Sequence, residues 1–228
     1  MNNDATKFKP IGYIKTDFKE KFGIPRQSGR APSTLGKIFF YPEYRNSDAL
    51  REIEGFNYIW LLFDFSLSHT EKWQPTVRPP RLGGNKKVGV FASRSPFRPN
   101  PIGLSSVKLL GVEKTRDGDA LFVSGVDLLD GTPIFDIKPY LPSSDCHVDA
   151  VGGYADQFTD YKLEVQFSDH LKGLIPAEKV DALIECLSDD PRPSYIEDER
   201  EYGLKFDAFN VKFTVKGKTL TVTKVEKI

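Results

Sequence analysis

Cysteine and histidine are scarce in this chain, and their scarcity excludes two kinds of protein. The 228 residues include two cysteines, Cys146 and Cys186, and three histidines. Two cysteines cannot form the disulfide framework of a small secreted protein. No cysteine or histidine lies at the spacing of zinc ligands, so we expect no metal site.

Long apolar stretches are also missing. No run approaches the roughly 18 to 20 apolar residues that span a bilayer, and the start, MNNDATKFKP, lacks the apolar centre of a signal peptide. We therefore expect a cytoplasmic protein without a membrane segment. Hydrophobic residues make up 39% of the chain and aromatic residues 12%, which is the composition of a globular protein and excludes general disorder.

Negative charge is absent from one long window. Between Lys72 and Val112 there is no aspartate or glutamate, although the composition of the chain predicts about six. The basic residues of this window are Lys72, Arg78, Arg81, Lys86, Lys87, Arg94, Arg98 and Lys108. A net charge of zero argues against a basic coat over the whole protein. The window therefore predicts a local cationic surface, and the alternative is a solvated face that neighbouring loops neutralise.

Short apolar segments bounded by glycine and proline predict a mainly β protein. Before residue 142 the expected strands are 9–18, 35–41, 58–65, 88–92, 104–112, 120–126 and 133–137. The segment RDGD at 116–119 predicts a hairpin turn. Regular strands with tight turns favour a closed or nearly closed antiparallel β-barrel, which we place in residues 1–145.

A small α+β domain is predicted for residues 155–228. Its expected elements are a strand at 161–167, a helix at 176–187 and a hairpin formed by residues 209–215 and 220–225. Residues 142–153 are polar and predict a loop between the two domains. One further helix is expected at 47–55, with Ser47 as its cap.

Two segments rich in proline and arginine are candidate ligand loops. They are GIPRQSGRAPS at 23–33 and RPPRLGGNKKVGVFASRSPFRPNPIGLS at 78–105. Proline fixes φ and removes a backbone donor, so a segment such as 93–105 forms a stiff loop. Arginines on a stiff loop suit phosphate or carboxylate groups, because preorganisation lowers the cost of ordering each contact. For 23–33 alone, a surface turn is the simpler explanation.

A third segment, DLLDGTPIFDIKPYLP at 127–142, contains three chemically distinct residues in its second half. Asp136, Lys138 and Tyr140 occupy alternate positions, so on a strand their side chains share one face. A carboxylate, an ammonium group and a phenol side by side match what proton removal needs, but a satisfied surface network would have the same pattern. The preceding DGTP at 130–133 has the composition of a turn.

Common enzyme motifs are missing from the chain. No strand is followed by GxGxxG with an acidic residue about twenty positions later, so a Rossmann nucleotide site is not expected. No GxSxG occurs and neither cysteine has a nearby histidine, which makes a hydrolase the weakest interpretation. A cofactor would have to lie on loops at the rim of the barrel, where the three segments fall.

Taken together, the motifs resemble those of the TrmO family, also called TsaA or YaeB-like proteins, which are S-adenosylmethionine-dependent tRNA methyltransferases. The resemblance rests on PRQ at 25–27, RPPRLGGN at 78–85, RSPFRPNPIGLS at 94–105, DGTPIFDIKPYLP at 130–142 and DPRPSY at 190–195. It extends over nearly the whole chain. It implies a homodimeric enzyme with a β-barrel catalytic domain that methylates the N-6 atom of threonylcarbamoyladenosine, next to the anticodon of certain tRNAs.

The resemblance also implies which residues hold the methyl donor, S-adenosyl-L-methionine. By position in the family motifs they are Pro25, Arg26, Gln27, Ser66, Leu67, Arg94, Leu104, Asp130, Gly131, Thr132 and Pro133. Relatives carry His-Gln where this chain has Ser66-Leu67, so main-chain contacts are the ones expected there.

The remaining candidate residues follow from charge and position. For contact with tRNA we expect Arg78, Arg81, Lys86, Lys87, Arg98 and Asn100. For catalysis we expect Asp136 or Tyr140 to accept the proton of the acceptor nitrogen, with Lys138 steadying negative charge. The alternative function is a non-catalytic β-barrel that binds RNA or protein.

Overall fold

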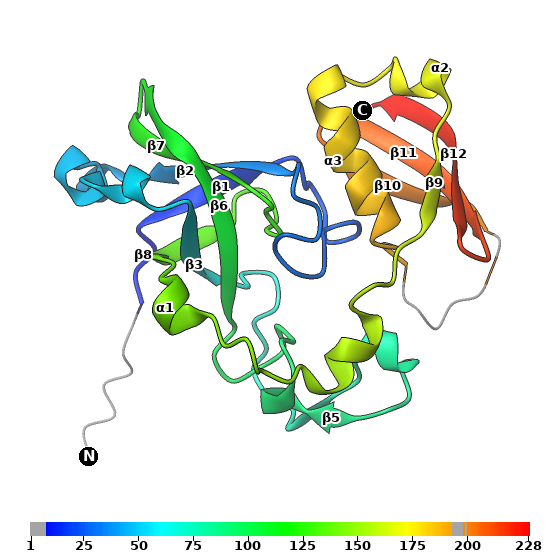
Figure 1. The fold of residues 1–228 in the computed structure, drawn as a ribbon, viewed down its shortest axis with the longest axis horizontal. Helices are drawn as coiled ribbons and strands as arrows, with labels where there is room; N and C mark the ends of the chain where they lie inside the picture. The colour runs from blue at the N-terminus through cyan, green and yellow to red at the C-terminus, as the bar shows by residue number, and fades with distance from the viewer. Residues whose placement is uncertain (1–7, 193–197, 199) are drawn as a thin grey trace.

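The computed structural model describes residues 8–192, 198 and 200–228 (Figure 1). Within this part of the chain, one sheet with the strand order β1-β2-β7-β6-β3-β8 closes into a barrel, and its pairs are antiparallel. The strands are β1 (Gly12–Thr16), β2 (Leu35–Phe40), β3 (Tyr58–Asp64), β6 (Ile102–Thr115), β7 (Gly118–Ser124) and β8 (Pro133–Pro139). The predicted mainly β class is therefore confirmed, as is the hairpin between β6 and β7.

Alternation of apolar and polar residues explains why these segments form a barrel. Along β3, Ile59, Leu61 and Phe63 are buried, whereas the residues between them are more exposed. Successive side chains of a strand point to opposite faces, so one row fills the barrel interior. A shift of one residue in the pairing would expose that row, and each buried aliphatic side chain stabilises the fold by roughly 1.5 to 3 kcal/mol.

The C-terminal unit contains a four-stranded sheet in the order β10-β11-β12-β9. Its strands are β9 (Glu164–Gln166), β10 (Tyr202–Phe206), β11 (Phe209–Lys216) and β12 (Thr219–Lys227), and its helices are α2 (Asp169–Lys172) and α3 (Ala177–Ser188). The predicted helix and final hairpin are confirmed as α3 and β11–β12. The sequence did not predict β10, which follows a strongly acidic segment.

Helix α3 connects the C-terminal unit with the barrel. Its Glu185 accepts hydrogen bonds from the backbone nitrogen of Ser33 at 2.7 Å and from its hydroxyl at 2.9 Å. Lys179 forms ion pairs with Asp17 before β2, at 2.6 Å, and with Asp207 after β10, at 2.7 Å. The loop between β1 and β2, which carries PRQ, is therefore held on one side by the C-terminal unit.

The helix predicted at 47–55 is wrong. The segment forms two 3-10 turns, Ser47–Leu50 and Ile53–Gly55, and Glu52 between them has a φ of 66°. Asn46, and not Ser47, accepts the capping hydrogen bond, from the backbone nitrogen of Asp48. A segment this short cannot offset the cost of starting a helix without extensive packing.

The strand predicted at 88–92 is also wrong beyond its first residues. Strand β5 (Val88–Gly89) pairs with β4 (Thr76–Val77) outside the barrel, and Val90–Ala92 is a 3-10 turn. The region expected to be a loop contains α1 (Pro142–Asp145), and the other 3-10 turns are Pro42–Tyr44, Pro80–Leu82 and Gly153–Phe158. In the part of the chain that the structure describes, no helix has the length and hydropathy to cross a membrane.

Candidate active site

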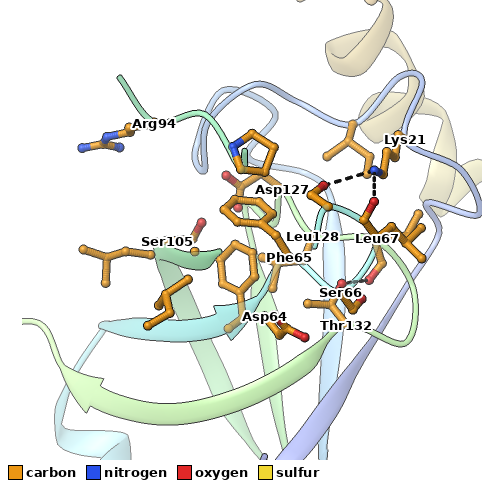
Figure 2. Close-up of a pocket in the computed structure, with 18 of the residues that line it drawn as sticks. Lys21, Asp64, Phe65, Ser66, Leu67, Arg94, Ser105, Asp127, Leu128 and Thr132 are labelled. Carbon is orange, nitrogen blue, oxygen red and sulfur yellow. Dashed lines mark hydrogen bonds between the residues drawn. The ribbon is translucent and has the colours of Figure 1, made fainter. Parts of the chain in front are cut away.

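A cavity of about 720 Å³ lies beside the ends of β3 and β6 (Figure 2). Its wall comes from segments that are far apart in the sequence: residues 21–27, 63–68, 93–98, 100–105 and 127–132 each contribute lining side chains. Both predicted ligand loops are among them. The exposed surface of the lining is more apolar than polar, with Phe63, Phe65 and Leu128 beside several polar and charged side chains, and this mixture of apolar walls and polar groups suits a small-molecule site.

Local hydrogen bonds fix the loops that form this wall. After β3 the chain turns at once, because the backbone nitrogen of Ser68 donates to the Phe65 carbonyl at 2.8 Å. The Lys21 ammonium group donates to the Leu67 carbonyl at 2.9 Å, which ties this turn to the β1–β2 loop. In the proline-rich loop, the Arg98 guanidinium donates to the Ser93 carbonyl at 3.1 Å. The cavity is therefore bounded by loops that are already ordered.

The structure brings most of the predicted donor-binding residues into this one cavity. Those that line it are Pro25, Arg26, Gln27, Ser66, Leu67, Arg94, Leu104 and Thr132. The other three belong to the adjacent DGTP turn: Asp130 accepts from the Thr16 backbone nitrogen at 3.0 Å and pairs with Lys19 at 2.9 Å, whereas Gly131 has a φ of 77°. Asp130 thus fastens the turn that presents Thr132.

The two arginine-bearing loops meet over the cavity. A guanidinium nitrogen of Arg94 donates to the side-chain oxygen of Gln27. The Arg26 guanidinium instead donates to the Arg192 carbonyl at 2.7 Å, and its buried Nε has no hydrogen-bond partner within residues 8–192, 198 and 200–228. Arg26 therefore lines the cavity and also reaches into the C-terminal unit, which its position in the PRQ motif did not predict.

Asp127 is a cavity residue that the sequence did not single out. Its Oδ1 is buried and has no hydrogen-bond partner among the described residues. The carboxylate also interacts with the Ser105 hydroxyl and with the Ser28 backbone, and burial raises its pKa to about 6. The only available signal was its place after a strand, at the start of DLLDGTP, and that signal does not reveal a missing partner.

The predicted RNA-contact residues are divided between three environments. Arg98 and Asn100 line the cavity. Arg78, Lys86 and Lys87 are exposed on the loop region around β4 and β5. Arg81 is different: it donates to the Phe158 carbonyl at 3.0 Å and lies over the Tyr161 ring, and burial lowers its pKa. Arg81 is thus part of the contact with the C-terminal unit.

The predicted catalytic residues lie beside the cavity and do not line it. Asp136 and Lys138 share the outer face of β8 and form an ion pair of 2.9 Å, as their alternation predicted. Tyr140 follows the strand and packs against Trp60, with 5.5 Å between ring centroids. In the sheet register, Leu62 lies between Leu104 and Asp136. Two strand spacings separate Asp136 from the cavity residue Leu104, which is roughly 10 Å.

Among the described residues, no group of three or more histidine, cysteine, aspartate or glutamate side chains is placed to hold a metal ion.

Comparison with known families shows to which family the chain belongs. Residues 13–146 match the family model described as the tRNA-methyltransferase O N-terminal domain, and residues 160–228 match the TrmO C-terminal domain. The chain belongs to the TrmO family.

Curated and solved relatives agree with this TrmO assignment. The chain is 42% identical to an Escherichia coli (strain K12) protein named tRNA (adenine(37)-N6)-methyltransferase, over 92% of this chain and 93% of the relative. It is 44% identical to a Pseudomonas aeruginosa protein named putative S-adenosylmethionine-dependent methyltransferase RcsF, over 86% and 87%. The crystal structure of TrmO from Pseudomonas aeruginosa superposes with a TM-score of 0.78 at 36% identity, covering 97% of this chain and 98% of that one.

Proposed function

We propose that this chain uses S-adenosyl-L-methionine to methylate the N-6 atom of threonylcarbamoyladenosine at position 37 of tRNA. The observation that carries the proposal is the convergence of eight predicted donor-binding residues on one cavity. Its close TrmO relatives are named as methyltransferases of this kind. We further propose a barrel catalytic domain in residues 1–145, a C-terminal domain in residues 155–228, and a cytoplasmic homodimer.

The cavity fits the proposed donor in size and chemistry. Its volume of about 720 Å³ lies within the range of small-molecule pockets. Apolar walls suit an adenine ring, and the backbone turns at Pro25–Gln27 and Ser66–Leu67 offer polar main-chain groups beside them. The buried, unpartnered oxygen of Asp127 also fits a site that receives a ligand with hydrogen-bond donors.

The work left to the protein is chiefly alignment. The bound donor supplies an electrophilic methyl group, and a displacement of this kind depends on holding donor and acceptor in line and keeping water out. Phe65, Leu104 and Leu128 give the cavity wall apolar surface against which the donor can pack. The hydrogen bonds of Arg98 to Ser93 and of Lys21 to Leu67 keep the loops from moving as the acceptor approaches.

The acceptor nitrogen must also lose its proton, and we assign this step to the face beside the cavity. Asp136 or Tyr140 accepts the proton, and Lys138 steadies the negative charge. The acceptor nucleoside would lie across the outer face of β3, between this trio and Leu104. The ion pair between Asp136 and Lys138 supports the assignment, because it holds the carboxylate and the ammonium group side by side on this face.

Substitution of Asp136 tests this assignment. In Asp136→Asn, methyl transfer to tRNA should fall by roughly 100-fold or more, while donor affinity changes by less than about twofold because Asp136 does not line the cavity. Turnover is measured with labelled donor and nucleoside digestion, and affinity by calorimetric titration. Asp119→Asn is the matched control, since it breaks a similar ion pair, with Lys114 at 2.8 Å, at the β6–β7 end of the barrel. Normal turnover in Asp136→Asn removes that residue from the role.

A titration of the wild-type protein separates the enzyme from a non-catalytic barrel. Saturable binding of S-adenosyl-L-methionine is required for the enzyme and absent from the alternative. Sedimentation at several protein concentrations measures whether the homodimer forms. Transfer of label to tRNA that carries threonylcarbamoyladenosine, but not to tRNA that lacks it, establishes the substrate.

A further inference from the structure

Asp127 stands out because cationic side chains outnumber carboxylates in the wall around it. Four cationic side chains line the cavity: Lys21, Arg26, Arg94 and Arg98. Figure 2 shows Asp127 among the labelled lining residues, with the Arg94 side chain extending away from them. A cationic ligand would be repelled from such a wall unless a negative charge lay within reach.

The cationic side chains already have partners of their own. Lys21 donates to the Leu67 carbonyl and Arg98 to the Ser93 carbonyl, while Arg94 donates to Gln27 and Arg26 to Arg192. None of these hydrogen bonds uses the Asp127 carboxylate. The carboxylate interacts with the Ser105 hydroxyl and with the charge of Arg94, but its Oδ1 atom is left without a hydrogen-bond partner among the described residues.

Asp64 is the other carboxylate among the described residues that line the cavity. Its Oδ1 lies 2.7 Å from the Nε2 atom of His69. No described residue is a comparable partner for the Oδ1 atom of Asp127. The two carboxylates therefore differ in what they can still bind: Asp64 is engaged with a neighbouring side chain, and Asp127 has an acceptor oxygen left over.

We propose that Asp127 is the residue that binds the positive charge of the methyl donor, through the Oδ1 atom that has no hydrogen-bond partner among the described residues. The inference rests on the proposed function, since S-adenosyl-L-methionine carries a sulfonium and an ammonium group. A buried carboxylate oxygen without a hydrogen-bond partner is costly to the folded protein. A cation seated against it would remove that cost, and a low-dielectric wall strengthens the attraction.

Three ligands identify which part of the donor Asp127 contacts. S-adenosyl-L-methionine carries both charges, S-adenosylhomocysteine has lost the sulfonium charge, and 5′-methylthioadenosine has neither charge but keeps the nucleoside. Affinities for the wild type and for Asp127→Asn are measured by calorimetry at pH 7, where an α-amino group is mostly charged. Asp64→Asn is the matched control, because it removes the same charge from the same cavity at a carboxylate that already has a partner.

We expect Asp127→Asn to lower the affinity for S-adenosyl-L-methionine by about tenfold or more, which is typical of losing a buried charged contact. Binding of 5′-methylthioadenosine should change by less than about twofold, and Asp64→Asn should weaken the donor by less than about threefold. An equal loss for S-adenosylhomocysteine assigns the contact to the ammonium group. A loss confined to S-adenosyl-L-methionine assigns it to the sulfonium.

The dependence of binding on pH gives a second readout. Donor affinity of the wild type should fall as pH drops below about 6, where the Asp127 carboxyl takes up a proton. Asp127→Asn should lose this dependence, and Asp64→Asn should keep it, which separates Asp127 from the Asp64–His69 pair. The other charged groups that line the wall are Lys21, Arg26, Arg94 and Arg98.

Some outcomes would overturn the inference. Unchanged affinity of Asp127→Asn for S-adenosyl-L-methionine removes the contact, and an equal loss for 5′-methylthioadenosine moves it to the nucleoside. Either result leaves the proposed function intact, because the wild type still binds the donor. Failure of the wild type to bind the donor at all would overturn the proposed function as well. Unfolding midpoints confirm that the variants are folded.

Discussion

The carboxylates of Asp189 and Asp127 both interact with the loop that carries PRQ, but their surroundings differ. Asp189, only 3% exposed, is surrounded by cations: it pairs with Arg30, and lies 3.6 Å from Arg81 and 3.7 Å from Lys162. Asp127 is half-buried beside the cavity, and its buried Oδ1 atom has no hydrogen-bond partner among the described residues. Asp189 is thus paired with cations of the protein, whereas Asp127 has an acceptor oxygen left over.

This difference suggests different roles for the two carboxylates: Asp189 stabilises the fold, and Asp127 is available to a ligand. Asp189 follows α3, and its partners come from the β1–β2 loop, from the basic window and from the segment before β9, so one carboxylate joins three parts of the chain. Removing a buried charge from water is costly, and here the cations offset that cost. At Asp127 the Oδ1 atom has no such partner in the part of the chain that the structure describes, so this site bears a cost that a ligand can relieve.

The strongest way to break the comparison is to remove the paired carboxylate. Asp189→Asn should lower the free energy of unfolding by about 2 to 4 kcal/mol, because the half-buried Arg30 and Arg81 would lose their carboxylate partner. Urea unfolding measures the change. Asp117→Asn is the control: its carboxylate is 67% exposed and 3.7 Å from Arg45, so the change should stay within about 0.5 kcal/mol.

A loss of less than about 1 kcal/mol in Asp189→Asn would mean that the cations are stabilised by solvent or by backbone carbonyls instead. In that case Asp189 would not be a structural counterpart of Asp127, and the contrast between the two carboxylates would disappear.

Removing the Asp127 carboxylate should change the free energy of unfolding in the opposite direction and make the protein more stable. Burial raises the pKa of Asp127 from 3.8 to about 6, so the folded state holds this proton more tightly than the unfolded state. Above pH 6 the charged carboxylate destabilises the fold, and Asp127→Asn should raise the free energy of unfolding by up to about 3 kcal/mol. As pH falls from 6 towards 4 the wild type regains this stability, and the difference between the proteins should vanish.

Urea unfolding of both proteins at pH 8 and pH 4 measures this change. Equal stability at pH 8 would show that the Asp127 charge is offset within the protein. The same variant is expected to bind the donor more weakly, so a gain in stability coupled to a loss of affinity sharpens the distinction between the two carboxylates.

The sequence predicts the parts of this molecule that depend on residues close together along the chain. The alternation of Ile59, Leu61 and Phe63 predicts a barrel strand without knowledge of its neighbours. Prolines predict the stiff loops, and the TrmO motifs predict which loop residues meet at the cavity. VGVFA at 88–92 has the composition of a strand, yet only Val88 and Gly89 find a partner strand, and no local signal reports that a partner is missing.

What the sequence does not predict depends on residues far away along the chain. The buried state of Arg81 is produced by Phe158, Tyr161 and Asp189, which lie at least 77 positions later. The missing partner of Asp127 depends on where Ser28 and Ser105 place their groups. Charge composition treats Arg78 and Arg81 as equal members of one basic window, whereas packing assigns them to different environments.

Arg78 and Arg81 provide the last test, for which the smallest effects are expected. Arg78 is exposed, so Arg78→Ala should leave stability nearly unchanged and flatten the dependence of tRNA affinity on salt by roughly 0.7 to 1 in log–log slope. Arg81→Ala should leave that slope unchanged and lower the free energy of unfolding by about 1 to 3 kcal/mol, because it removes a partner of Asp189. Filter binding between low and moderate salt, with urea unfolding beside it, measures both. If Arg81 instead carried the salt dependence, tRNA would have to open the contact that Asp189 closes, and the carboxylate described as structural would belong to the binding surface.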